Sequence, residues 1–154
     1  MAKFKIVIYK PVIPGNTGSI GRTCVALDLE LILIGPYGFK IDDKSVRRAG
    51  LDYWKHVKLK EYKSWDDFLD TEKPNNEQLF FFSKLAEKSV FKAKFKKDSY
   101  LIFGSETTGL PNSFFIDYPE CFFSLPMYSD KIRSLNLSNV ATAVAYEAIR
   151  QSLQ

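Results

Sequence analysis

The sequence has two cysteines, one histidine and no long apolar run, and each shortage excludes a class of protein. Cys24 and Cys121 stand among apolar neighbours and form no Cys-x-x-Cys pair, so we expect two ordinary thiols in a reducing compartment, the cytoplasm. Because His56 is the sole histidine, we expect no metal bound by the usual Cys and His ligands. No apolar stretch approaches the ~20 residues that cross a bilayer, so we expect no membrane partner.

What is present fits one globular domain that covers residues 1–154. Hydrophobic residues make up 45% of the chain and charged residues 26%, a mixture typical of folded proteins in water. The net charge of +4 and the pI near 9.0 permit a polyanionic partner without establishing one. Lysines alternate with apolar residues over 91–97, and Arg47-Arg48 form a second basic spot. Such lysines usually form a solvated face, and phosphate contacts by Lys94 and Lys96 are the alternative.

Apolar strand-like segments alternate with helix-like segments along the whole chain. The expected strands are Phe4–Tyr9, Leu31–Ile34, Val57–Leu59, Gln78–Ser83, Tyr100–Phe103 and Cys121–Leu125. The expected helices are Thr17–Leu29, Asp42–Ala49, Ser64–Leu69 and Asn136–Gln151. Strands that are apolar throughout and interleaved with helices predict an α/β fold with a mostly parallel sheet and helices on both faces. Ligands of such sheets bind beyond the carboxyl ends of the strands, which here are the loops after Tyr9, Ser83, Phe103 and Leu125.

The loop after the first strand leads into a segment whose arginine can supply a positive charge near the strand ends. It reads Asn16-Thr17-Gly18-Ser19-Ile20-Gly21-Arg22. Asn16 or Thr17 can cap the following helix, and Arg22 lies one turn further in, from where its guanidinium can reach back toward the strand ends. The simpler interpretation is a helix cap followed by a surface arginine. The functional one is a cation placed over an RNA phosphate or ribose.

Two further segments combine strand ends with small and polar residues. The first is Leu101-Ile102-Phe103-Gly104-Ser105-Glu106-Thr107-Thr108-Gly109-Leu110-Pro111, in which Gly104 permits close approach of a ligand and Glu106 can accept hydrogen bonds. It is neither a dinucleotide fingerprint nor a phosphate-binding Walker loop, and alone it fits a structural turn as well as a site. In the second, polar residues at 134, 136, 138 and 139 crowd the start of the last helix. One of them would suffice as a cap, so capping alone does not account for the cluster, and a binding role fits it as well as a structural one.

The three segments together, in this order, resemble the SPOUT superfamily of RNA methyltransferases. They match its Asn-x-Gly-x-x-x-Arg, Gly-x-Glu-x-x-Gly-Leu-Pro and Ser-x-Asn-x-Ser motifs. Asp42-Asp43-Lys44 and the stretch from Arg47 to Tyr53 make the chain most similar to the single-domain tRNA (cytidine/uridine-34-2′-O)-methyltransferases. Two departures stand out: Ser105 replaces the usual proline, and one extra residue lies between Met127 and Arg133.

The resemblance implies a fold, a partner and a reaction. The fold would contain a trefoil knot near the C-terminus, and the enzyme would be a homodimer in which each active site borrows residues from the other subunit. The reaction would transfer a methyl group from S-adenosylmethionine to the ribose 2′-hydroxyl of the wobble nucleotide, position 34, in the anticodon loop of tRNA.

The resemblance also assigns residues to roles. The catalytic site would contain Arg22, Glu106, Ser134 and Asn136. The cofactor would contact Phe82, Gly104, Leu125, Pro126, Met127 and Ser134. The RNA would contact Asn16, Arg22, Arg47, Arg48, Lys94, Lys96 and Arg133. Because a guanidinium has a pKa above ~12, Arg22 is expected to act as an electrostatic stabiliser and not as a base.

Two alternatives stay open beside this resemblance, and the residues argue against a third. The chain could be a 2′-O-methyltransferase for another tRNA position or for rRNA. It could be a non-catalytic RNA-binding module with the knot fold, although the complete set of motif residues argues against this. A nucleotide-dependent oxidoreductase would need a dinucleotide fingerprint after the first strand, and Ile13-Pro14-Gly15-Asn16 does not supply one.

Overall fold

One six-stranded sheet, with every pairing parallel, organises the chain in this computed structural model, which describes residues 3–40 and 53–153. The strands are β1 (Lys5–Tyr9), β2 (Glu30–Ile34), β3 (Lys58–Tyr62), β4 (Leu79–Phe82), β5 (Tyr100–Phe103) and β6 (Phe122–Phe123). They lie in the order β3-β2-β1-β5-β4-β6. The predicted parallel sheet is therefore confirmed, with the first strand near its centre.

Burial explains the composition of the individual strands. In β4 and β5 all four residues are buried, and in β1 and β2 the middle residues are, because helices cover both faces of the sheet. The strand β3 reads Lys-Leu-Lys-Glu-Tyr and has no buried residue. It lies at one edge of the sheet, where charged side chains discourage pairing with another chain.

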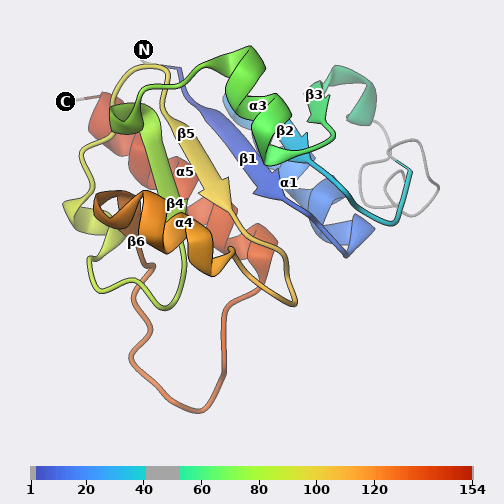
Figure 1. The fold of residues 1–154 in the computed structure, drawn as a ribbon. Helices are drawn as coiled ribbons and strands as arrows, with labels where there is room; N and C mark the ends of the chain where they lie inside the picture. Colours follow the sequence, from blue (N-terminus) through green and yellow to red (C-terminus); the bar gives the residue numbers. More distant parts are fainter. Residues whose placement is uncertain (1–2, 41–52, 154) are drawn as a thin grey trace.

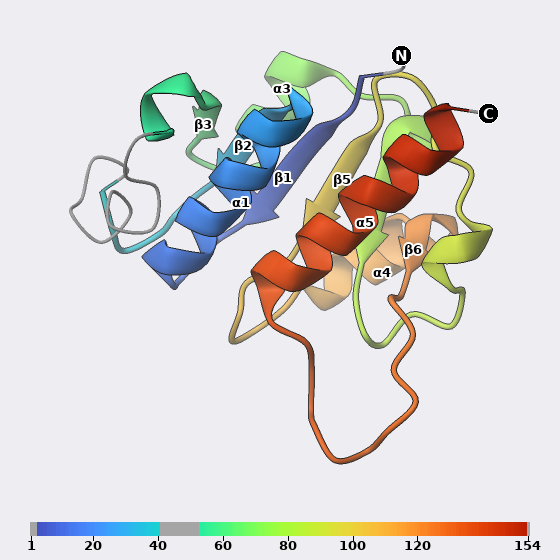
Figure 2. The same ribbon diagram turned by 180° about the vertical axis from the view of Figure 1, so that it is seen from behind.

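Two pairs of helices enclose the sheet. Helices α1 (Pro14–Leu27) and α5 (Leu137–Ser152) cover one face, and α3 (Trp65–Glu72) and α4 (Asn112–Asp117) cover the other (Figures 1 and 2). Within the first pair, the hydroxyls of Thr23 and Thr142 share a hydrogen bond of 2.8 Å. The expected helices on both faces are therefore confirmed for the part of the chain that the structure describes.

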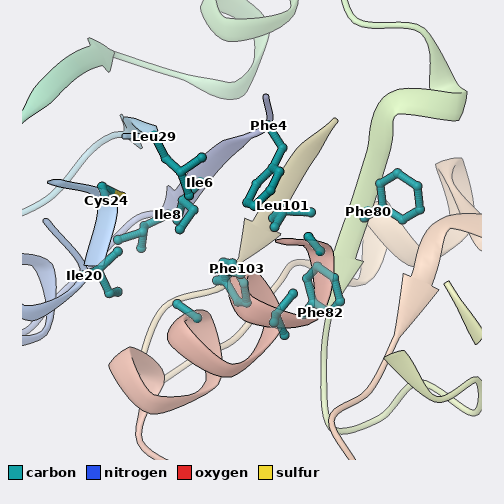
Figure 3. Packing of buried hydrophobic residues seen from close by; sticks show 14 of the residues in the cluster. Phe4, Ile6, Ile8, Ile20, Cys24, Leu29, Phe80, Phe82, Leu101 and Phe103 are labelled. Carbon is teal, nitrogen blue, oxygen red and sulfur yellow. The ribbon is translucent and has the colours of Figure 1, made fainter. Parts of the chain in front are cut away.

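Alternating side chains of the central strands feed two separate cores. Ile6 and Ile8 of β1 pack with Ile20 and Cys24 of α1 and with the buried alanines of α5 (Figure 3). Val7, between them, points to the opposite core, which is rich in aromatic rings from α3 and α4. Burial raises the pKa of the Cys24 thiol to about 12, so this cysteine behaves as a small apolar side chain.

Several predicted boundaries were wrong. Helix α1 begins at Pro14, at the first helical position where proline is favoured, and its N-cap Ile13 offers no side-chain hydrogen bond. Asn16 and Thr17 therefore lie inside the first turn and do not cap it. The strand β3 starts one residue later than predicted and extends to Tyr62, β6 has two residues instead of five, and no bounds were predicted for α4. The predicted helix over Asp42–Ala49 lies outside the described residues.

Within residues 3–40 and 53–153, no helix is both long and apolar enough to cross a membrane.

Candidate active site

A cleft of about 840 Å³ lies beyond the carboxyl ends of β4 and β5, where the topology of a parallel sheet places a ligand site. Its volume falls within the ~300–1,000 Å³ typical of small-molecule sites. Three segments far apart in sequence supply most of the lining: the loop after β4, the loop after β5, and the connection from β6 into α5. Apolar walls come from Phe82, Phe103, Leu110, Phe115, Leu125, Met127, Leu137 and Val140.

The carboxylate of Glu106 anchors one rim of the cleft. Its two oxygens accept hydrogen bonds from the backbone N–H groups of Val12 (2.8 Å) and Ile13 (2.9 Å), just before α1. A third hydrogen bond, of 3.1 Å, comes from the side-chain amide of Asn16. The loop after β5 is thereby attached to the start of α1, and the geometry of Glu106 is that of a residue that positions other groups.

Asn16 connects this carboxylate to the start of α5. Its side-chain oxygen accepts a hydrogen bond of 3.2 Å from the amide of Asn136, while its own amide donates to Glu106. Asn136 is the N-cap of α5, and its oxygen accepts hydrogen bonds from the N–H (2.9 Å) and the hydroxyl (2.6 Å) of Ser138. One chain of side-chain hydrogen bonds thus joins the three motif segments.

Gly104 shapes the loop that carries Glu106. A Cβ at this position would lie 2.4 Å from the backbone carbon of Gly109 and 2.6 Å from the nitrogen of Leu110. The loop closes on itself through two backbone hydrogen bonds between Ser105 and Gly109, and Gly109 adopts a positive φ of 65°. The glycine was expected to permit close approach of a ligand, and it does line the cleft; its missing Cβ also makes room for the backbone of its own loop.

The connection from β6 to α5 projects away from the body of the fold (Figures 1 and 2). Tyr128 in this loop is 96% exposed, and Ile132 and Leu135 are also exposed. The ammonium group of Lys84, in the loop after β4, donates a hydrogen bond of 3.0 Å to the backbone carbonyl of Arg133. Both residues line the cleft, so this contact crosses it from one loop to the other.

The structure brings together most of the predicted site residues. The lining of the cleft includes Asn16, Phe82, Gly104, Glu106, Leu125, Met127, Arg133, Ser134 and Asn136. Pro126 lies between two lining residues but is not itself part of the lining. The cofactor-contacting set that the resemblance implied is thus gathered at one place.

Arg22 lies away from this cleft. It stands about 9 Å further along α1 than Asn16 and about a third of a turn around the helix. Its guanidinium carbon lies 5.3 Å from the centre of the Tyr53 ring, a cation–π distance. Burial raises the pKa of Tyr53, while the positive charge of Arg22 acts in the opposite direction. The structure therefore places the arginine on an exposed part of α1, outside the lining.

The lysines predicted to contact RNA lie at the amino ends of the strands, at the opposite end of the sheet from the cleft. Lys94 and Lys96 belong to the connection that enters β5 at its amino end, whereas the cleft lies beyond the carboxyl ends. Lys96 also forms an ion pair of 2.8 Å with Glu77. Arg47 and Arg48 lie outside the described residues.

Several lining residues were missed from the sequence. Ser83, Lys84 and Leu85 line the cleft directly after β4, and Ile13 lines it before α1. The rule that ligands bind at strand ends had drawn attention to both loops, but no motif marked these residues individually. Lys84 is the one among them that adds a charge.

The apolar walls and polar rim can hold a flat heterocycle attached to a polar group. Within the described part of the chain, no group of three or more His, Cys, Asp or Glu residues is placed to bind a metal ion.

The comparison with protein families decides the assignment. Residues 3–146, which include all of this cleft, match the SpoU rRNA Methylase family. The chain belongs to the SpoU rRNA methylase family.

Relatives within the SpoU family are similar over nearly their whole length. A tRNA (cytidine(34)-2′-O)-methyltransferase of Burkholderia cenocepacia is 39% identical over 150 residues, which cover 97% of this chain and 96% of the relative. A Listeria monocytogenes relative, whose name gives the same activity provisionally, is 46% identical over 149 residues, 95% of this chain and 86% of its own.

Two solved structures share this fold and are related in sequence. One, which concerns the 2-OH methylation of C/U34 on tRNA, has a TM-score of 0.90 and 39% identity, covering 99% of this chain and 97% of its own. The other is the SpoU methyltransferase AviRb of Streptomyces viridochromogenes in complex with AdoMet. Its TM-score is 0.83 at 29% identity, with 100% of this chain and 60% of that chain covered.

Proposed function

We propose that this chain transfers a methyl group from S-adenosylmethionine to the ribose 2′-hydroxyl of nucleotide 34, a cytidine or uridine, in tRNA. The observation that carries the proposal is the hydrogen-bonded chain Glu106–Asn16–Asn136, which assembles the three motif segments beside one cleft. The substrate position rests on relatives of nearly equal length whose names give tRNA cytidine 34.

The cleft suits an adenosyl group. Phe82, Leu125 and Met127 offer apolar surface against which a purine ring can pack, and Ser134 offers a hydroxyl at the rim. AviRb, which is 29% identical, binds AdoMet in its own structure. When bound, S-adenosylmethionine supplies a methyl group on a positively charged sulfur, which is a good leaving group.

The chain's own residues then have to position the acceptor hydroxyl. Alignment of two reactants can contribute of the order of ~7–11 kcal/mol in favourable intramolecular cases. Glu106, Asn16 and Asn136 hold the three loops in a fixed arrangement, so they act as positioning residues. Arg22 stabilises negative charge that develops on the ribose oxygen, because a guanidinium stays protonated at neutral pH.

The proposal includes a homodimer with shared active sites. Arg22 lies outside the lining of its own cleft, and Val12, Ile13 and Tyr146 expose apolar surface on the adjacent loop and on α5. We propose that a second copy covers these residues and that Arg22 of the partner subunit completes the cleft. This arrangement agrees with an isologous interface, in which the same surface of both subunits meets and each subunit contributes its Arg22 to the cleft of the other.

The proposal also includes the C-terminal knot and the cytoplasm. The connection between β4 and β5 is hydrogen-bonded to the end of β6 (Val90 N–H to Ser124 O, 2.7 Å) and to α5 (Gln151 Nε2 to Ala93 O, 2.9 Å). The second bond holds α5 beside the connection between β4 and β5. In the proposed knot, this connection is the loop through which α5 passes. A tRNA substrate and two free thiols agree with a reducing compartment.

The test is transfer of tritium from labelled S-adenosylmethionine to tRNA from a strain that lacks this enzyme. The proposal expects label as a 2′-O-methyl group at position 34 and nowhere else. Label at another position would keep the reaction and overturn the substrate. No label, from a protein that binds S-adenosylhomocysteine and receives tRNA with its other modifications intact, would favour the non-catalytic module.

A further inference from the structure

The loop that carries Met127, Arg133 and Ser134 into the cleft has little of its own to hold it. Its apolar side chains Tyr128 and Ile132 are more than half exposed, so they add no core contact. The one hydrogen bond within it joins the Lys131 N–H to the Ser129 hydroxyl at 3.1 Å. Packing against the core resumes only at Leu125 and Leu137, on either side of the loop.

Among the described residues, a single hydrogen bond connects residues 126–135 to the rest of the fold. It runs from the ammonium of Lys84 to the carbonyl of Arg133, 49 positions later, over 3.0 Å. A charged donor makes this bond stronger than one between neutral groups. It also lies directly beside Ser134, the hydroxyl expected to contact the cofactor.

The backbone next to Lys84 is held in place by three hydrogen bonds of Ser83. The preceding residue, Ser83, donates its N–H to the carbonyl of Phe123 in β6 (3.0 Å), and its hydroxyl accepts from the Leu85 N–H (3.1 Å). A turn closes behind it, with the Ala86 N–H donating to the Ser83 carbonyl (3.1 Å). A fixed backbone reduces the entropy that Lys84 loses when it holds the other loop.

We propose that Lys84 is a positioning residue of the cofactor site, which it acts on by tethering the loop 126–135 across the cleft. This inference rests on the proposed function for the identity of the ligand, but the tether itself can be measured without any ligand. Without the ammonium, the loop samples other positions, and the fraction of molecules ready to bind the cofactor falls. The apparent affinity falls by the same factor.

Three variants test the tether. Lys84→Met keeps the length of the side chain and removes the donors, and Lys84→Arg keeps a cationic donor. Lys97→Met is the matched control, because Lys97 is exposed near the amino end of β5, away from the cleft. The rate of tryptic cleavage after Lys131 and Arg133 in the folded protein without ligand reports on how freely the loop moves. Calorimetry with S-adenosylhomocysteine reports on binding, and kcat and KM for S-adenosylmethionine are measured separately.

The tether predicts faster cleavage in the loop of Lys84→Met and about ten-fold weaker binding, the size expected for one charged hydrogen bond. KM should rise more than kcat falls, and Lys84→Arg and Lys97→Met should stay within about three-fold of the wild type. Unchanged cleavage in Lys84→Met overturns the tether, and weaker binding with unchanged cleavage would mean direct contact with the ligand instead. If the wild type does not bind S-adenosylhomocysteine, the proposed function fails while the cleavage rates still decide about the tether.

Discussion

The side-chain amide of Asn136 donates a hydrogen bond of 3.2 Å to the side-chain oxygen of Asn16, 120 positions earlier in the chain. Asn16 in turn donates to Glu106, so its single side chain serves as acceptor on one side and as donor on the other. It is only 9% exposed, and water therefore competes weakly for either bond. Asn16 was expected to contact RNA, yet its polar atoms already have protein partners.

Replacement of Asn16 by alanine should loosen the site without unfolding the protein. The loss of the two side-chain hydrogen bonds of Asn16 should lower the free energy of unfolding by about 1–2 kcal/mol. Turnover should fall at least about ten-fold, because small displacements of reacting groups are costly. Urea denaturation and methyl transfer measure the two effects. Asn112→Ala, at an exposed position in α4, is the control, and equal turnover in both variants would refute the positioning role.

Gly104→Ala should be among the most damaging single-methyl changes in the chain. The added Cβ would meet backbone atoms of Gly109 and Leu110 at 2.4 and 2.6 Å, and backbone cannot move aside as a flexible side chain can. We expect a loss of about 1–3 kcal/mol or more in the free energy of unfolding. Gly15→Ala is the matched control, since no atom lies within 4 Å of its Cβ and it sits in a helix. Its stability should rise by about 0.4–1 kcal/mol, and similar urea midpoints for both variants would contradict the geometry.

The strands were predictable because burial on both faces leaves a signal in every residue. Continuous apolar runs such as Leu79–Phe82 and Tyr100–Phe103 identified β4 and β5 almost to the residue. The same signal fails at short or exposed elements. The edge strand β3 has no buried residue, so no run of apolar residues marks where it begins and ends. Helix α4 has only six residues and too few turns to show a period.

The site was predictable as a set of segments but not as a set of contacts. Glu106, Asn16 and Asn136 stand out through the resemblance, while their mutual hydrogen bonds depend on a strand order that no local pattern encodes. Lys84 was missed because a lysine at a loop has no distinctive pattern. Its proposed role as a tether rests on its hydrogen bond to the carbonyl of Arg133, 49 positions away.

The carboxylate of Glu72 should make the stability of the fold depend on acid. Its side chain is 7% exposed and accepts a hydrogen bond of 2.8 Å from the Tyr100 hydroxyl and another from Tyr62, with Lys60 nearby. Burial alone would raise the pKa of Glu72, but the two hydroxyls and Lys60 outweigh it and lower the pKa below its ordinary value. The stabilisation is therefore present above the unfolded-state pKa of about 4.3, and it is lost as the pH falls through the lower folded-state pKa.

Glu72→Gln tests this dependence. The variant should be less stable than the wild type at pH 7 and should lose less stability between pH 7 and pH ~3, because it has no proton to bind. Urea midpoints at the two pH values give the comparison. Glu87→Gln, at an exposed position, should follow the wild type at both pH values. If Glu72→Gln also follows the wild type, the cluster does not contribute to acid stability.

Arg22 provides the strictest test of a shared active site. Arg22→Ala should bind S-adenosylhomocysteine normally, since the arginine does not line the cleft, and should lose most of its turnover. Asn136→Ala should also lose turnover, because this substitution damages the cleft of the subunit that carries it. When the two variants are mixed and allowed to exchange subunits, each heterodimer would contain one intact site, made from the cleft of one subunit and the arginine of the other. About half the dimers are then mixed, so the mixture should recover about a quarter of wild-type activity. If native mass spectrometry shows the heterodimer and activity stays at the level of the separate variants, Arg22 serves the cleft of its own subunit and the shared site is wrong.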